Sequence, residues 1–535
     1  MPRYLNKWAG CALLALLLAT APHAKAQIQP ASTTPLTLTL DEAIQIALVQ
    51  NYAVRSARLN VDNANAQIRE AWGQIMPQVS ANSSYTRNVR QANPFSGSSA
   101  GNLFGSLGFI DWLAFNEQAR TDSDPTTNAI AFGDFLARQQ QGLDDAGIVI
   151  DASDNPFAVP NQFQNTISIT QKVFDIRAFW GISGAEKFFQ AQQEAGLNRQ
   201  EQLLIQQVKQ AFYGALLAEE QVRVIRASEG RTQVTLDEMA KQVRQGVQPK
   251  FQRLTAEVEL ANIETQRIQT ENQAGTALDN LKMVLGMPQT QAVSLRGALD
   301  APVSTDYLTV SASDAMTTAL DRRPDLLQAN IAVELQRLQA RVEKAARYPT
   351  LDAFANFSYI GNVPDNRDFT VSDPNDPFRF SRGSNGFFSD SYWDQTIGVG
   401  FQLNWTLFNG FQTRYRIQQF QIATEQAKIQ EEQLRESVRM EVEQARRDLR
   451  NAQQRITGQQ RNVERAELNY TYVQTRLGEG VATQLEERQA SDLLDQSRLN
   501  LLQAVFDYKV AEAAYEAALG LPPEATVSNT NITSN

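Results

Sequence analysis

Apolar residues recur with a helical coiled-coil period over two long stretches of the chain, about 177–245 and 411–479. They step alternately by four and three positions in both stretches: Leu204, Val208, Ala211, Ala215, Ala218, Val222 and Ile225, then Val438, Val442, Ala445, Leu449, Ala452 and Ile456. A strict 3.5-residue period is typical of helices that wrap around one another. At ~1.5 Å per residue, a helix of about 68 residues reaches roughly 100 Å, a length that suits a rod or a tube.

A period of two marks four shorter stretches. Residues 167–173 and 351–359 alternate between apolar and polar side chains, and 79–89 does so more weakly. The clearest stretch is 396–407, where the apolar positions are Ile397, Val399, Phe401, Leu403, Trp405 and Leu407. Strands of about ten residues with one apolar and one polar face are the signature of a membrane β-barrel with a wet lumen. A soluble sandwich sheet shows the same alternation, but the long helices and the export signal described below favour the barrel.

The two halves of the chain are copies of one another. With a shift of 272 positions, Ala43–Pro77 aligns with Ala315–Pro349 without a gap. With a shift of 234, Phe174–Pro288 aligns with Phe408–Pro522, again without a gap. The difference of 38 positions is an insertion in the first half. Such self-similarity predicts a tandem repeat.

Each repeat predicts the same order of elements. A helix over 41–76 or 313–348 comes first, with Asp41 or Ser313 as its N-cap. Two strands, the long helix, a glycine turn and a helix of about 36 residues follow. The last helix ends at a Leu-Gly-x-Pro sequence in both copies, and glycine followed by proline is a typical helix stop.

The N-terminus predicts a secretory signal peptide. Arg3 and Lys7 precede a short apolar run at 12–21, and Ala24–Ala26 forms an A-x-A cleavage site. The run is too short to cross a bilayer as a helix, and no other apolar run in the sequence is long enough to do so. The protein is therefore predicted to be exported, either as a soluble protein or inserted in a membrane through its strands.

The repeats and the signal predict four segments. They are a signal peptide at 1–26, a first repeat at 27–298, a second repeat at 299–523 and a polar, disordered tail at 524–535.

Composition excludes several classes of protein. The 535 residues carry a formal net charge of −10, which argues against a nucleic-acid partner. Cys11 and His23 are the single cysteine and histidine, and both lie in the predicted signal. The mature chain then has no disulfide, no thiolate or imidazole metal site and no His or Cys catalysis, so we expect no cofactor and no metal. Lipidation of Cys11 is disfavoured because the apolar run follows the cysteine.

Two other classes of function can be weighed against a pore. Carboxylates such as Asp144 with Asp145, or Asp122 with Asp124, could form an acid/base pair. Adjacent Asp residues in a Gly-rich loop are usually only solvated, and we predict no enzyme. A structural or adhesive coiled-coil rod anchored by a small membrane barrel is the main alternative. The duplication argues against it, because a simple anchor needs one set of strands.

Four strands cannot close a barrel, and open strand edges are not tolerated in lipid. Several chains must therefore share one barrel. Two chains give about eight strands, which side chains fill, whereas three give about twelve and leave a channel. A pore favours three chains.

The chain resembles the TolC-like outer-membrane efflux proteins of Gram-negative bacteria. The resemblance rests on the duplicated order of elements and on several sequences: Leu38–Leu48, the stops at Leu285–Pro288 and Leu519–Pro522, and Arg476–Val481 with Ala490. It implies a mainly α fold with a membrane β part. A homotrimer would share a 12-stranded β-barrel with four strands per chain, continued by a long coiled-coil α-helical barrel.

The resemblance also implies a function and partners. The trimer would be the passive exit duct of a tripartite efflux pump or of a type I secretion system. It would lie in outer-membrane lipid, with a large periplasmic portion. A periplasmic adaptor (membrane fusion) protein would connect it to an inner-membrane pump of RND or ABC type.

The resemblance places the glycine turns, Gly246-Val247 and Gly480-Val481, at the periplasmic tip, where adaptors dock and the channel narrows. The family often carries acidic residues six and nine positions after this glycine. The second repeat has Glu486 and Gln489 there, with Glu487 adjacent. The first repeat departs from the pattern, with Gln252 and Thr255. A threefold ring of Glu486, with or without Glu487, would favour cations at the entrance. The alternative is a solvated helix face.

The connections between paired strands, 93–161 and 362–392, are predicted to be outward loops because they are long. The first is aromatic-rich. Its rings could form a lid or pack the loop against the barrel rim, and we favour packing: Phe95, Phe104, Phe109, Trp112 and Phe115.

Overall fold

The computed structural model describes residues 36–91, 107–123, 127–149, 159–299, 303, 306–374 and 376–521. The predicted signal peptide and tail lie outside these residues. Each helix in the described ranges is too short or too polar to cross a membrane. The chain forms two compact units, and each repeat contributes to both. Of the described residues, the helical unit draws on those in 36–63, 190–333 and 427–521, and the sheet unit on those in 64–189 and 334–426.

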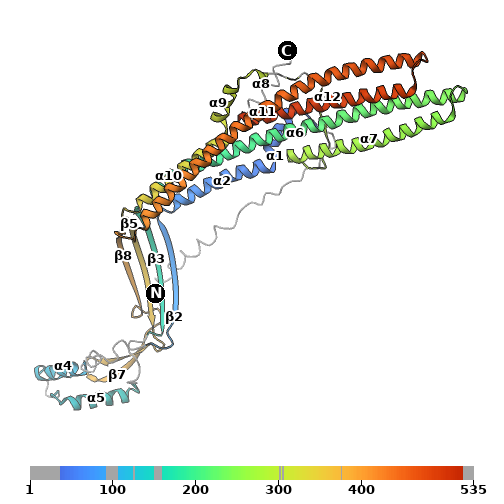
Figure 1. The fold of residues 1–535 in the computed structure, drawn as a ribbon. Helices are drawn as coiled ribbons and strands as arrows, with labels where there is room; N and C mark the ends of the chain where they lie inside the picture. The colour runs from blue at the N-terminus through green and yellow to red at the C-terminus, as the bar shows by residue number, and fades with distance from the viewer. Residues whose placement is uncertain are drawn as a thin grey trace. The chain divides into compact units, whose positions relative to one another are not determined.

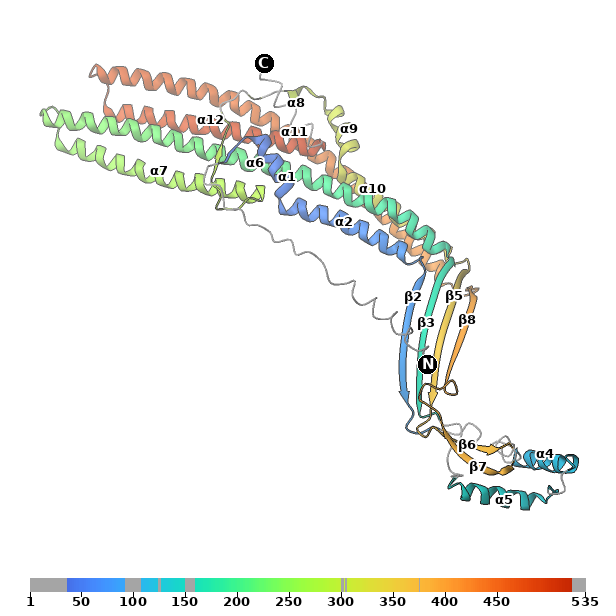
Figure 2. The same cartoon turned by 180° about the vertical axis from the view of Figure 1, so that it is seen from behind.

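Four long helices dominate the chain, and the sequence predicted their bounds to within a residue or two. They are α6 (Ile176–Arg244), α7 (Lys250–Leu285), α11 (Gln412–Gly478) and α12 (Gln484–Leu519). They run side by side within the helical unit (Figures 1 and 2). The predicted heptad positions of α6 from Leu204 to Ile225 are all buried. Those of α11 from Val438 to Ile456 are buried or packed against the same core. The coiled-coil period is therefore confirmed as the core-forming pattern.

The first helix of each repeat is two helices instead of the predicted one. The first repeat has α1 (Leu40–Gln50) and α2 (Tyr52–Gly73), and the second has α9 (Ala312–Arg322) and α10 (Pro324–Ala345). Pro324 explains the second break, because proline has no N–H and forces the preceding residue into an extended conformation. In the first repeat the side chain of Asn51 accepts hydrogen bonds from the next turn and starts a new helix.

The predicted N-caps, Asp41 and Ser313, are also wrong. Thr39 caps α1 in a capping box with Glu42, and the Ser311 hydroxyl accepts a hydrogen bond from the amide of Asp314. In both cases a hydroxyl two residues earlier than predicted satisfies the free N–H groups of the first turn.

The four predicted strands form one antiparallel sheet in the order β2-β3-β5-β8. The strands are β2 (Gln78–Arg87), β3 (Asn161–Phe174), β5 (Thr350–Val363) and β8 (Trp393–Asn404). The last strand was predicted to reach 407 but ends at Asn404. Its partner β5 begins at Thr350, which pairs with Asn404, so the next residues have no strand beside them.

The sheet has one apolar and one polar face. The register places Ile397 beside Phe357 and Phe357 beside Ile167, and the polar neighbours of these residues share the opposite face. On β8, the side chains of Ile397, Val399 and Phe401 are more than 70% exposed, and β2 is exposed along its whole length. Within the described residues, the edge strands β2 and β8 each pair on one side only. The described residues therefore leave the apolar face and both edges uncovered.

Smaller elements complete the two units. In the helical unit, β1 (Leu36–Leu38) pairs in parallel with β4 (Val293–Leu295), and α8 (Asp306–Thr309) precedes α9. The connection between β2 and β3 carries α4 (Leu107–Thr121) and α5 (Phe132–Asp145). The connection between β5 and β8 carries the hairpin β6 (Asp368–Asp373) and β7 (Asp376–Ser384).

The aromatic side chains of the first connection pack, as favoured, but their partners lie in the loops themselves. Phe109 and Trp112 contact Phe132, and Phe115 contacts Phe378 of the other connection. The remaining two predicted rings, Phe95 and Phe104, lie outside the described residues.

Candidate functional site

The two glycine turns have the same geometry. Gly246 and Gly480 have φ values of 78° and 72°, in the left-handed region that glycine adopts without strain. The amide of the next residue, Val247 or Val481, donates to the carbonyl oxygen five residues earlier in the helix, at 2.9 Å in both turns. These bonds complete the helix end. The two valines are 68% and 65% exposed, so each turn presents an apolar side chain to solvent.

Glu486 has a structural role at the start of α12. The backbone N–H of Thr483 donates to its carboxylate at 2.7 Å, and the Thr483 hydroxyl accepts from the Glu486 amide at 3.3 Å. The hydrogen bonds from Thr483 hold the pKa of Glu486 below its ordinary value. The pair is a capping box, and the sequence Thr-x-x-Glu was the signal for it. The first repeat has Pro249 at this position and no side-chain cap.

Glu487 lies in a different environment from its neighbour. Burial raises the pKa of its carboxyl above the ordinary value, although a hydrogen bond from Tyr470 and the charge of Arg231 act in the opposite direction. Together with Gln252 and Thr255 it lines a cavity of about 140 Å³. The structure therefore brings three of the predicted entrance residues together. The other two, Glu486 and Gln489, are exposed and do not line this cavity.

An ion pair that sequence reasoning missed joins α12 to α6 beside this cavity. Nη2 of Arg231 lies 2.5 Å from both carboxylate oxygens of Asp495, and its Nε donates to the Ser491 hydroxyl at 3.1 Å. A second pair, Arg488 with Glu259, joins α12 to α7 at 3.2 Å. Asp495 aligns with an alanine of the first repeat. This charge, present in one repeat only, was the one sequence feature that could have pointed to the ion pair.

These environments predict opposite effects of neutralising two acidic residues. Asp495→Asn is expected to lower the free energy of unfolding by up to ~3 kcal/mol, because Arg231 would lose its charged partner. Glu487→Gln is expected to leave it unchanged or raise it at pH 7. The folded-state pKa of Glu487 lies above that of the unfolded chain, so its charge destabilises the fold at neutral pH, and this deficit disappears as the pH falls below about 4. Thermal unfolding of both variants at pH 7 and pH 4, followed by circular dichroism, measures the contrast. Equal losses at pH 7 would contradict it.

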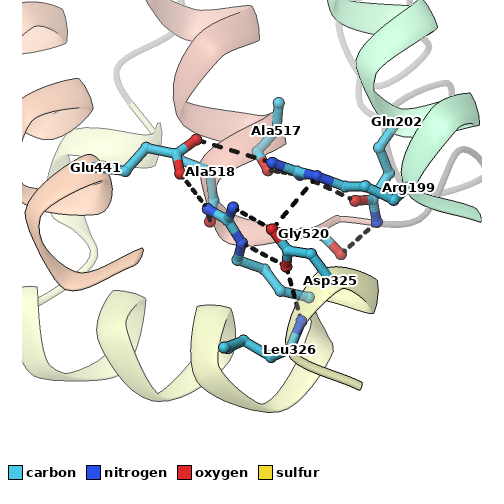
Figure 3. A network of polar contacts seen from close by, with 9 residues as sticks. Arg199, Gln202, Asp325, Leu326, Glu441, Ala517, Ala518 and Gly520 are labelled. Atoms are coloured by element: carbon cyan, nitrogen blue, oxygen red, sulfur yellow. Dashed lines mark hydrogen bonds and ion pairs between the residues drawn. The ribbon is translucent and has the colours of Figure 1, made fainter. Parts of the chain in front are cut away.

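A second polar cluster lies at the break between α9 and α10 and holds the C-terminal end of α12 (Figure 3). Arg323 is 3% exposed and lies 2.6 Å from Asp325 and 2.7 Å from Glu441 of α11. It also donates to the carbonyl of Ala518 at 3.4 Å. From α6, Arg199 donates to the carbonyl of Ala517 and Gln202 to that of Gly520, at 3.2 and 3.1 Å. The cluster thus satisfies backbone acceptors that the last turn of a helix leaves free.

We call this cluster the α12 clamp, because it holds the end of that helix. The first repeat contains a simpler clamp of the same kind. Asn51 aligns with Arg323, and its side-chain amide donates to the carbonyl of Val284 at 2.8 Å. Val284 aligns with Ala518 under the second shift. The duplicated contact indicates a structural role for both clamps.

Among the described residues, no group of three His, Cys, Asp or Glu side chains could hold a metal ion.

Comparison with known proteins identifies the fold and the family. A sequence model of the family described as outer membrane efflux protein matches residues 118–287 and 315–521, one match in each repeat and together more than half of the chain. The chain is 23% identical over 373 residues to the alkaline protease secretion protein AprF of Pseudomonas aeruginosa, covering 68% of this chain and 71% of that protein.

Solved structures show the same fold. The Campylobacter jejuni CmeC outer membrane channel aligns with a TM-score of 0.62 at 12% identity, over 93% of this chain and 90% of that chain. The outer membrane protein VceC of Vibrio cholerae aligns with a TM-score of 0.61 at 14% identity, over 90% and 96%. The tandem repeat, the mainly α fold and the strand pairs are therefore confirmed. The chain belongs to the outer membrane efflux protein family, and it is an exit duct of the Gram-negative outer membrane with a large periplasmic portion rather than an enzyme.

Proposed function

We propose that three copies of this chain form the passive exit duct of a tripartite efflux pump or of a type I secretion system. The observation that carries the proposal is the four-stranded sheet with an apolar face, a polar face and two unpaired edges. Neighbouring copies would pair β8 with β2, and three copies would supply about twelve strands, enough for a barrel with an open lumen. The apolar face would meet lipid, and the polar face would line the path of the cargo.

The long helices would continue the path across the periplasm. The turns at Gly246-Val247 and Gly480-Val481 present matching apolar side chains, which supports a periplasmic adaptor protein as the docking partner. An inner-membrane pump of RND or ABC type would supply the energy through that adaptor. The secretion role named for AprF supports the secretion assembly, and the match to the outer membrane efflux protein family supports the efflux assembly.

The entrance would lie at the same turns. Glu486 is exposed at the first turn of α12, and Glu487 lines the cavity with Gln252 and Thr255. In a trimer these carboxylates would repeat three times around the axis and favour cations.

Single-channel recording in planar lipid bilayers tests the duct and its entrance together. We expect discrete conductance steps from the purified trimer and a preference for cations over anions, measured as a reversal potential in a salt gradient. Glu486→Gln with Glu487→Gln should reduce that preference severalfold. Glutamine is the right replacement because it preserves the capping acceptor at position 486. Glu432→Gln is the matched control, because Glu432 is an exposed glutamate on a different helix, α11, far along the chain from the turns.

The outcomes separate the parts of the proposal. Steps whose selectivity does not change in the double variant would refute the entrance and leave the duct intact. A protein that gives no steps and has the mass of a single chain would refute the duct.

A further inference from the structure

The two outward connections fold together into one small structure, the outer module, which comprises α4, α5, β6 and β7 (Figures 1 and 2). The ring of Phe378 on β7 lies 5.2 Å from that of Phe115 and 5.3 Å from that of Phe135. The guanidinium of Arg382 donates to the carbonyl of Gly147 at 2.5 Å. Gly142 lies so close to the backbone of Phe378 that a Cβ would be 1.8 Å from its carbonyl oxygen. The module therefore has its own packed interior, built from both repeats.

A cleft of about 590 Å³ opens between the helices and the hairpin of this module. Its volume lies in the range of small-molecule sites, roughly 300–1,000 Å³. The apolar part of its lining is aromatic and aliphatic: Phe115, Phe135, Leu143, Pro374, Pro377 and Phe380. Its polar part consists of amides, hydroxyls and two carboxylates: Gln118, Gln139, Thr127, Thr370, Ser372, Asp111 and Asp122.

The charge of the cleft has one sign. The described residues that line it include two aspartates and no lysine or arginine. Asp111 is exposed and forms no hydrogen bond or ion pair with the described residues, and Asp122 accepts a hydrogen bond from the Thr127 hydroxyl at 2.8 Å. A ligand that enters the cleft therefore meets negative charge close to aromatic rings.

The rest of the module reinforces this sign. Its described residues in 107–149 and 368–384 include nine acidic residues and four arginines. Three of those arginines already have partners. Arg120 forms an ion pair with Glu117, Arg138 lies over the ring of Phe378, and Arg382 donates a hydrogen bond to a backbone carbonyl. Such an excess concentrates cations near the surface, and the faces of aromatic rings attract cations in addition.

We propose that the outer module binds organic cations with an aromatic or apolar body in this cleft. The apolar body would lie against the phenylalanine and proline side chains, and Asp111 and Asp122 would face the positive centre. The site is separate from the entrance at the helix turns and does not depend on it.

Isothermal titration of the full-length protein in nonionic detergent with tetraphenylphosphonium tests the proposal, with protein-free micelles as the blank. We expect saturable binding of one cation per chain. Tetraphenylborate is the matched probe, because it has nearly the same shape and the opposite charge, and it should not bind. Asp111→Asn with Asp122→Asn removes the Coulomb attraction of two carboxylates and should weaken binding of the cation at least ~10-fold. Gln118→Arg, which adds a positive charge to the lining, should weaken it similarly.

Asp144→Asn with Asp145→Asn is the control, because these carboxylates belong to the same module and do not line the cleft. It should change the affinity less than twofold. Equal binding of the two probes, equal weakening by the control, or the absence of saturable binding at millimolar cation would overturn the proposal. Conductance of the Asp111→Asn, Asp122→Asn variant without the probe should match the unmodified protein, which separates this result from the test of the duct.

Discussion

Replacement of Arg323 by alanine is expected to lower the free energy of unfolding by ~3–5 kcal/mol, the usual effect of removing one partner from a buried ion pair. Arg323 is 3% exposed and contacts two carboxylates, Asp325 and Glu441. Its loss leaves the half-buried Asp325 with one nearby cation, Arg199 at 3.6 Å, and with the amide of Leu326 as a hydrogen-bond donor at 3.0 Å. It also removes a donor from the carbonyl of Ala518 at the end of α12. Chemical denaturation of the purified protein, followed by circular dichroism, measures the loss.

The matched control is Arg337→Ala. Arg337 also pairs with a carboxylate, that of Glu334 one turn earlier, but it is exposed on a helix surface. Such a pair contributes at most ~1 kcal/mol. Similar losses for the two variants would show that Arg323 does not act through its buried contacts.

The same clamp predicts a dependence on pH. Burial alone would raise the pKa of Asp325, but the hydrogen bonds from Arg323 and the charge of Arg199 outweigh it and hold the pKa below its ordinary value. This contribution to stability is complete above the pKa of the unfolded chain, about 3.9, and is lost as the pH falls through the lower folded-state value. The loss of stability between pH 5 and pH 2 should therefore be smaller in Arg323→Ala than in the unmodified protein.

Alanine at Gly286 or Gly520 is expected to destabilise the protein by at least ~2 kcal/mol, more than alanine at the turn glycine Gly246. All three residues have left-handed backbones, with φ of 74°, 69° and 78°, and alanine costs ~1–2 kcal/mol in this region. At Gly286 a Cβ would also lie 2.6 Å from the carbonyl oxygen of Gln50, and at Gly520 it would lie 2.9–3.1 Å from Arg323. At Gly246 nothing lies within 4 Å.

The three alanine variants should therefore differ in thermal unfolding midpoint, measured under one set of conditions. Midpoints that fall equally in all three variants would contradict this prediction. They would show that the structure accommodates a Cβ beside Gln50 or Arg323 without a loss of stability.

Periodicity was enough to predict the long helices, which bury their apolar residues within the chain, and the four strands, which leave theirs exposed. The heptads of α6 and α11, the four strands and the two repeats all follow from spacing alone, because a side chain's face is set by its position in the period. The left-handed stops at Gly286 and Gly520 were equally readable, since glycine followed by proline has one common use at a helix end.

The remaining features depend on competition between local signals or on tertiary placement. The break before Pro324 was readable and was missed, because the apolar pattern continues across it. The spacing of Thr483 and Glu486 is that of a capping box, but Glu486 was interpreted only as an acidic residue of the entrance. Pairs such as Arg199 with Asp325 could not be predicted, because the partners lie far apart in sequence and neither position shows a charge pattern. The proposed limits of the repeats, 27–298 and 299–523, describe the duplication, whereas the compact units combine residues from both repeats.

Disulfide cross-linking between sheet edges tests most directly whether three copies close the barrel. The described chain contains no cysteine, so cysteine can be placed at Asn82 on β2 together with Thr396, Gly398 or Gly400 on β8, one pair at a time. Within one chain, β2 and β8 are separated by two strands, about 14 Å at ~4.8 Å per strand, too far for a disulfide. Each single-cysteine variant is the control and should give no linked chains.

We predict that at least one pair, on oxidation, gives linked species of two and three chains and none larger, because a ring of three has no free edge. Folded protein that stays as single chains in all three pairings, or a series that continues beyond three chains, would contradict the account.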